Sequence, residues 1–273
     1  MAFPNTLYLT PAQVLTESAT NTIPLGTRAI LADGRVFRRA KNAATALKVG
    51  MGIHSAALGE MACVNTSAGG EFPAGTTIGT TWNRFTLGGS FYSVDLDANA
   101  YAEGWLLVGS TQYYSAQMLK IKSHGAVTAG TSGSHVDAPS TFILEDGYYP
   151  VEAINTSQGF GLLKNPYDSV VVMTTNSAMT RAIIGITPIA VTASYYFWAQ
   201  TWGLAMIKMA DASTSVTMLG RPVSISPAAN TTGFCTYSSS AAAVTEGSWT
   251  QFAVLHSGCT AGGYATANIM IAP

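Results

Sequence analysis

Glycine and proline divide this chain into short segments, and that division limits what it can fold into. Its 273 residues include 27 glycines and 11 prolines, and the intervening segments are rich in threonine, valine, isoleucine and aromatic residues. Short β-branched and aromatic segments between turn residues are typical of antiparallel β proteins. No window sustains the helical period of about 3.6 residues over several turns. The sequence therefore predicts an all-β fold, a β-sandwich or β-barrel of short antiparallel strands with few short helices.

One of the predicted strands carries large side chains on both faces. In YYFWAQTW, Tyr196, Trp198 and Gln200 share one face, while Phe197 lies on the other. Aromatic rings on both faces predict that this strand is covered from both sides. The predicted strands are residues 169–175, 195–203, 204–210, 249–256 and 267–272.

The beginning of the chain differs in pattern from the rest. Residues 1–24 have no evident strand partner of their own and predict an extended N-terminal arm. Thr10 as N-cap and Pro11 as first helical residue predict one short helix within it. We expect a main β domain over 25–210. A C-terminal β region over 211–273 either continues that domain or forms a small subdomain.

Basic residues gather in PLGTRAILADGRVFRRAKN, residues 24–42. The whole chain holds only 13 lysines and arginines, with a net charge of −1. Asp33 and Gly34 predict a β-hairpin turn, because both tolerate tight turn geometry. On the returning strand, Arg35 and Arg39 point to one face and Arg38 to the other. The five clustered basic residues are Arg28, Arg35, Arg38, Arg39 and Lys41.

The arginine cluster is interpreted as a protein contact. A nucleic-acid surface would gather its arginines on one face beside exposed aromatic rings, so we expect no specific nucleic-acid partner. An edge hairpin whose arginines bond a neighbouring subunit fits the alternation better. We expect that replacing Arg35 and Arg39 with alanine weakens assembly without unfolding the protein. For each tryptophan taken singly, core packing is favoured over a role in the interface. The predicted subunit-interface residues are Arg28, Arg35, Phe37, Arg38, Arg39, Trp198 and Trp202.

Charge is scarce along the whole chain. Charged residues make up 10%, where an ordinary soluble domain carries about 25%. A largely neutral polar surface suits a protein inside a large assembly, where desolvating charge is costly. It also suits a domain exposed to harsh surroundings outside a cell.

No recognisable motif predicts catalysis, and we expect no catalytic residue, no cofactor, no metal and no enzyme activity. The histidines lack metal-ligand spacing, and neither a P-loop nor a nucleophile elbow occurs. Ser134, His135 and Asp137 are too close in sequence to form a triad readily. The odd number of cysteines, Cys63, Cys235 and Cys259, predicts buried inert thiols.

The sequence gives no sign of a membrane or secretory segment. The most apolar run, residues 182–191, is interrupted by Pro188, so we expect no membrane span. MAFPNTLYLT lacks the basic and apolar regions of a signal peptide, which predicts synthesis in a reducing cytosol.

Five blocks of the chain are scattered from residue 5 to about 210: NTLYLTPAQVL, PLGTRAILADGRVFRRAKN, MLKIKSHGAV, GLLKNPYDSVVV and YYFWAQTWGLA. Together they resemble a group of tailed-bacteriophage proteins encoded near the major capsid protein. The resemblance implies a virion structural protein on the capsid surface, made in the host cytoplasm, that decorates or cements the head. Its expected partners are the major capsid protein and further copies of itself, as a homotrimer. No functional residue is carried over from the group.

Two other functions stay open at this point. One is a tail-tube or head-to-tail connector protein, which would assemble into rings. The other is a β module at the virion surface that binds host glycans through exposed aromatic residues. The major capsid protein itself is disfavoured, because its usual fold needs a long helix that this sequence lacks.

Overall fold

The structure, a computed structural model, describes most of the chain. Within the described residues the fold is nearly all β, with one short helix, α1 (Pro11–Val14). This confirms the predicted fold class. The chain divides into two compact units, residues 3–57 with 166–273, and residues 58–165. The described ranges are 6–56, 84–89, 97–109, 116–126, 136–145, 147–148, 159–172, 181–210, 219–225, 233–237 and 251–272.

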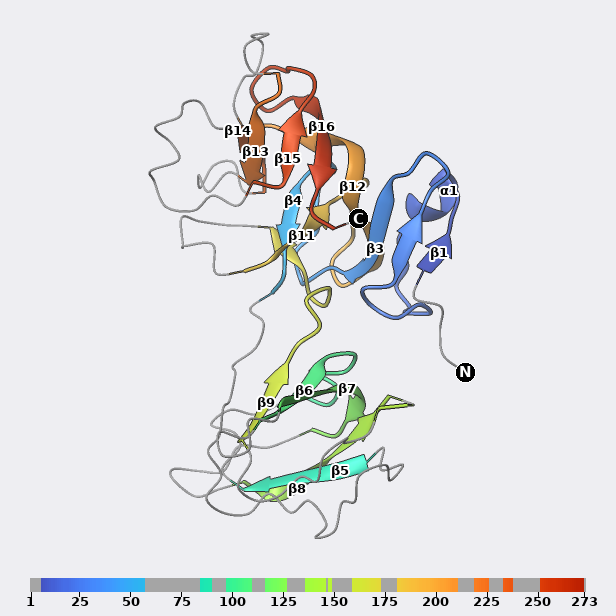
Figure 1. The fold of residues 1–273 in the computed structure, drawn as a ribbon, viewed down its shortest axis with the longest axis vertical. Coiled ribbons are helices and arrows are strands. Elements are labelled where there is room, and N and C mark those ends of the chain that lie inside the picture. The colour runs from blue at the N-terminus through green and yellow to red at the C-terminus, as the bar shows by residue number, and fades with distance from the viewer. Residues whose placement is uncertain are drawn as a thin grey trace. The chain divides into compact units, whose positions relative to one another are not determined.

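The larger unit, residues 3–57 with 166–273, is built on one sheet. Its main path runs β1-β2-β3-β12-β16-β15-β13-β14, and β4, β10 and β11 branch from it (Figure 1). β1 and β2 are parallel, and the other pairs are antiparallel. The strands are β1 (Thr6–Tyr8), β2 (Arg28–Ile30), β3 (Val36–Lys41), β4 (Gly52–His54), β10 (Val171–Val172), β11 (Ile183–Ile186), β12 (Tyr196–Lys208), β13 (Pro222–Ile225), β14 (Cys235–Tyr237), β15 (Ala253–Leu255) and β16 (Tyr264–Met270).

β12 joins the two halves of this sheet. Its first part, from Tyr196, pairs with β3, and its second part, from Trp202 to Lys208, pairs with β16 (Figure 1). The register with β3 shifts between Gln200 and Trp202. The two strands predicted over 195–203 and 204–210 are therefore one continuous strand.

Both faces of the first part of β12 are covered, as the sequence predicts. Phe197 and Ala199 pack in one cluster with Ile53 of β4 and Ile184 of β11. Trp198 packs on the opposite face with a cluster that includes Val14 of α1, together with Ala29, Leu31 and Phe37. Layers on both sides of the same strand make this unit sandwich-like.

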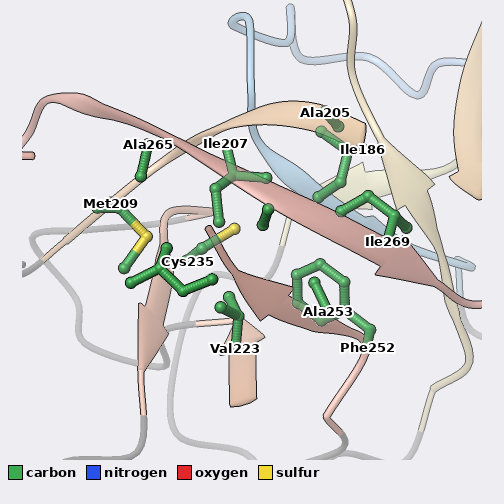
Figure 2. Packing of buried hydrophobic residues seen from close by; sticks show 12 residues of the cluster. Ile186, Ala205, Ile207, Met209, Val223, Cys235, Phe252, Ala253, Ala265 and Ile269 are labelled. Carbon is green, nitrogen blue, oxygen red and sulfur yellow. The ribbon is translucent and has the colours of Figure 1, made fainter. Parts of the chain in front are cut away.

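A third cluster fills the space around the second part of β12. Figure 2 shows Ile207 and Met209 together with Cys235 and Phe252. Alternate residues of β16 complete it, because Ala265, Ala267 and Ile269 all point inward. The C-terminal strands therefore share a core with β12.

The predicted N-terminal arm is wrong for the described residues. β1 pairs in parallel with β2, and Ser18 forms an isolated bridge with Tyr196. Val14 is buried, with 1% of its surface exposed. The sequence hides this pairing because the partner strand begins about twenty residues later, and pairing over that distance leaves no local signal. The short helix is confirmed, with the backbone N–H of Thr10 donating to Gln13 Oε1 over 2.8 Å.

The predicted boundaries at 24 and 210 do not coincide with the two units. β16 pairs with β12, so the described residues beyond 210 belong to the same unit as β1–β4. Residues 58–165 form the other unit, which interrupts the predicted main domain. Strands from both ends of the chain pair in one sheet. The composition of the sequence does not indicate this pairing.

The smaller unit, residues 58–165, contains a separate antiparallel sheet. Its strand order is β5-β8-β7-β6-β9. Leu106, Ile121 and Phe142 lie in its buried cluster. No helix in the described part of either unit is long and apolar enough to cross a membrane. The strands are β5 (Arg84–Gly89), β6 (Trp105–Gly109), β7 (Ala116–His124), β8 (Val136–Leu144) and β9 (Gly159–Leu163).

Candidate functional site

The basic stretch forms the predicted β-hairpin, but the hairpin is not at an edge. β2 and β3 pair in antiparallel fashion, and Gly34 takes φ +84° in the turn. β3 also pairs with β12, so it is an interior strand, and β1 lies at the end of the sheet path. The prediction of an edge hairpin is wrong because residues 6–8 add a strand beyond β2.

Arg35 is held by contacts within its own hairpin. Its Nε lies 2.8 Å from Asp33 Oδ2 in an ion pair. The Arg35 backbone N–H donates to Asp33 Oδ1 over 3.1 Å, and this bond is the main cause that lowers the pKa of Asp33. The stem of Arg35 faces Gly203 of β12. This arginine fixes the turn against β12.

Arg39 is buried inside the chain. It is only 4% exposed, and its guanidinium carbon lies 5.8 Å from the ring centroid of Tyr196 and 5.5 Å from that of Trp198. Burial lowers its pKa below the ordinary value for arginine. Its Nε has no hydrogen-bond partner in the described part. Arg39 is therefore a desolvated cation close to two aromatic rings of β12.

Two other predicted interface residues also lie in the core of the unit. Phe37 is fully buried and Trp198 is 3% exposed. Replacing either side chain, or Arg39, would first destabilise the fold. A substitution at these positions therefore cannot weaken assembly while leaving the stability of the protein unchanged. Trp202 is half-buried.

Arg28 and Arg38 face each other across the hairpin. They are direct register partners. Hydrogen bonds from Leu31 N to Arg35 O and from Arg39 N to Thr27 O lie on either side of them. This alternation makes Arg28 and Arg38 a non-hydrogen-bonded pair, in which Cα atoms approach to about 4.5 Å. Like charges directly opposite each other destabilise a sheet.

The contacts of this pair leave much of its hydrogen-bonding capacity unused. Arg38 Nη1 donates to Gly26 O over 3.1 Å. The Nε atoms of Arg28 and Arg38 are buried without a partner, and within the described residues neither side chain forms an ion pair. Burial raises the pKa of the neighbouring Tyr167, and the charge of Arg38 opposes that rise. Both arginines are half-buried and still reach solvent.

The same face of the sheet continues onto β1 with apolar residues. Tyr8 is the register partner of Ile30, and Thr6 that of Arg28. Partners in neighbouring strands share a face, so the arginine pair lies beside Tyr8 and Ile30. Tyr8 is 83% exposed. We call Tyr8, Arg28, Ile30 and Arg38 the arginine face.

A second exposed surface lies on β12 and β16, and sequence reasoning missed it. Leu204 and Met206 are 54% and 58% exposed, while the alternating Ala205 and Ile207 are buried. Met270 of β16 is 43% exposed on the same face, since it pairs with Trp202. The segment LAMIK has apolar residues at both its odd and its even positions. The alternation of the sequence therefore does not indicate which of these side chains are exposed. We call Trp202, Leu204, Met206, Tyr264 and Met270 the apolar face.

Two of the described histidines, His54 and His124, are buried and serve packing. His124 stacks on Phe142 with ring centroids 4.7 Å apart, and its Nε2 accepts the Tyr101 N–H over 3.0 Å. Burial lowers the pKa of His124, and also that of His54. Within the described part, no three histidine, cysteine, aspartate or glutamate residues gather as metal ligands. Ser134 and His135 lie outside the described residues.

Cys235 fits the prediction of a buried inert thiol. It is fully buried, and burial raises its pKa to about 12. Cys259 is half-buried, and Cys63 lies outside the described residues. The prediction is confirmed for Cys235 alone.

Comparison with known proteins identifies no relative. No family model, no curated protein and no solved structure matches the chain.

Proposed function

We propose that this protein is a structural component of a tailed-bacteriophage virion, a decoration or cement protein that bridges neighbouring capsomers. The observation that carries the proposal is the apolar face. Leu204, Met206 and Met270 are each more than two-fifths exposed on one face of paired strands. Contiguous exposed apolar residues on a sheet mark a surface that a protein partner covers.

The surroundings of that face support a permanent contact. Lys208 is its described basic residue, and its Nζ lies 5.1 Å from the ring centroid of Tyr264. The rest of the face is uncharged, and interfaces are depleted of charge at their centre. The sequence resembles phage proteins that are encoded beside the major capsid protein. This resemblance suggests the major capsid protein as the partner that covers the apolar face. The apolar face therefore packs on the shell.

The experiment measures how many copies each purified particle carries. Phage particles are assembled with wild-type protein or with the Leu204→Lys, Met206→Lys double variant, and quantified by mass spectrometry. Wild-type protein at high copy number and loss of the variant are expected. The matched control is Met118→Lys, because Met118 is 53% exposed on the other unit. It should keep full occupancy.

Two results would overturn the proposal. One is a low wild-type copy number, and the other is a double variant that binds as well as Met118→Lys. Rings or stacked rings on the tail, seen by electron microscopy, would assign the protein to the tail tube or connector. Heads that lack the protein are expected to resist heat and osmotic shock less well than complete heads.

A further inference from the structure

We infer that Arg28 and Arg38 bind carboxylates on the smaller unit of a second copy of this chain, so that copies join head to tail. Two like charges face each other across β2 and β3. No carboxylate in the described part of the chain pairs with either one. A bound carboxylate would relieve this repulsion, because each guanidinium fork can bond its two oxygens at once.

The distribution of charge along the chain points to a second copy as the source of that carboxylate. Residues 58–165 contain nine acidic and four basic residues, a net charge of −5. The remaining residues contain five acidic and nine basic residues, a net charge of +4. The whole-chain charge of −1 conceals this asymmetry. Complementary potentials steer association and select orientation.

Other members of the arginine face fit a protein partner. Tyr8 is 83% exposed, and Ile30 lies half-buried beside the two arginines. Tyrosine and arginine are enriched among the residues that contribute most to protein interfaces. A free phosphate would leave the tyrosine and isoleucine uncovered. The face therefore combines a charge-assisted contact with an apolar border.

The acidic partner is assigned to two carboxylates among the described residues of the smaller unit. Asp97 is exposed and Glu145 is half-buried. Their neutralisation should weaken the attraction of this unit for the arginine pair.

An interface between two different surfaces is heterologous, and this has a geometric consequence. Each copy offers one arginine face and one acidic unit, so association continues until the chain of copies closes into a ring. A homotrimer of this kind is cyclic. The inference deepens the proposed function, because it names the contact through which copies on a shell hold one another.

The test mixes two variants of the full chain. Arg28→Glu, Arg38→Glu removes the arginine face, and Asp97→Asn, Glu145→Gln neutralises the acidic partner. Sedimentation velocity is measured on each protein alone and on an equimolar mixture. We expect the wild type to self-associate, and each variant to weaken that association at least about tenfold in Kd. The mixture should form one-to-one dimers that grow no further, since one complementary interface survives.

Salt and a conservative variant supply the controls. Wild-type association should weaken between about 50 mM and about 500 mM NaCl, as the screening length shrinks. Arg28→Lys, Arg38→Lys keeps the charge but loses the planar fork, so its affinity should lie between wild type and the glutamate variant. Far-ultraviolet circular dichroism confirms that every variant is folded.

Several outcomes would overturn the inference. These are a wild type that stays monomeric, variants that associate like the wild type, or a mixture in which no dimer forms. Binding of inorganic phosphate by a monomeric wild type, lost in Arg28→Glu, Arg38→Glu, would assign the pair to a small oxyanion instead. These measurements use the isolated protein and need no phage particles. The inference can therefore be confirmed or overturned independently of the proposed binding of the apolar face to the shell.

Discussion

The guanidinium of Arg39 lies 5.5 Å from the ring centroid of Trp198, its register partner in the neighbouring strand. The ring attracts the cation, while burial and an unpartnered Nε penalise it. The two effects oppose each other. The hydrocarbon stem of Arg39 therefore contributes more to stability than its charge does.

Substitutions of Arg39 test this balance. Arg39→Ala removes the stem and leaves a cavity, so the free energy of unfolding should fall by about 2–4 kcal/mol. Arg39→Met keeps an unbranched stem and removes the desolvated charge, and should stay within about 1 kcal/mol of wild type. Urea unfolding followed by tryptophan fluorescence measures both. Equal losses in the two variants would show that the cation itself stabilises the strand pair.

Gly203 and Gly34 form a matched pair for a backbone test. Both take positive φ, +87° and +84°, respectively. A Cβ at Gly34 would meet no atom within 4 Å, whereas one at Gly203 would lie 3.1 Å from Arg35 Cγ and 3.3 Å from Arg35 Cα. Gly34→Ala should cost about 1–2 kcal/mol of unfolding free energy through strain alone. Gly203→Ala should cost more, because β12 must also move away from Arg35. A smaller loss at Gly203 than at Gly34 would contradict this account.

The sequence predicts local features of the arginine hairpin well. Asp33 and Gly34 specify the turn through their own backbone preferences, and Thr10 with Pro11 begins the helix where expected. Strand alternation separates Arg38 from Arg39 correctly, since they pair with Arg28 and Trp198 on different faces. Each of these features depends on a few adjacent residues.

What covers each face could not be predicted in the same way. Arg39 is buried because the N-terminal segment around Val14 packs on its side of the sheet. Arg38, on the opposite face, stays half-buried. Both outcomes depend on the pairing of β1 with β2, which is set by tertiary packing and leaves little mark in composition. The apolar face was missed because residues 204–207 are apolar at every position, so alternation does not show which of them are exposed.

Thiol reactivity should distinguish the two described cysteines. Only the thiolate reacts readily with iodoacetamide, and burial raises the pKa of Cys235 to about 12. Cys259 is half-buried and reaches solvent. Peptide mapping after labelling of the native protein should find Cys259 modified and Cys235 unmodified. Labelling in urea should modify both, which controls for peptide recovery. Rapid native labelling of Cys235 would show that the cluster in Figure 2 opens readily.

Acid should destabilise the fold through its buried histidines. The Tyr101 N–H donates to His124 Nε2, and His124 Nδ1 lies 2.7 Å from Gly125 O. This arrangement fits the neutral ring with its proton on Nδ1. A proton on Nε2 would break the bond from Tyr101, and burial already lowers the His124 pKa from its ordinary 6.5.

The sign of the pH effect follows from that lowered pKa. As pH falls below about 6.5, the unfolded chain takes up the proton first, so the free energy of unfolding decreases. The loss continues until pH passes the lower pKa of the folded state. His54, whose pKa is also lowered by burial, acts in the same direction. Stability should therefore be full above pH about 6.5 and decline below it.

Thermal unfolding across this pH range checks the prediction with two variants. His124→Gln should be less stable than wild type at neutral pH, but its stability should fall less steeply on acidification. His256→Gln is the matched control, because His256 is exposed. Its curve should keep the full slope of the wild type. If His124→Gln retains that full slope as well, His124 is not one of the groups through which acid unfolds this protein.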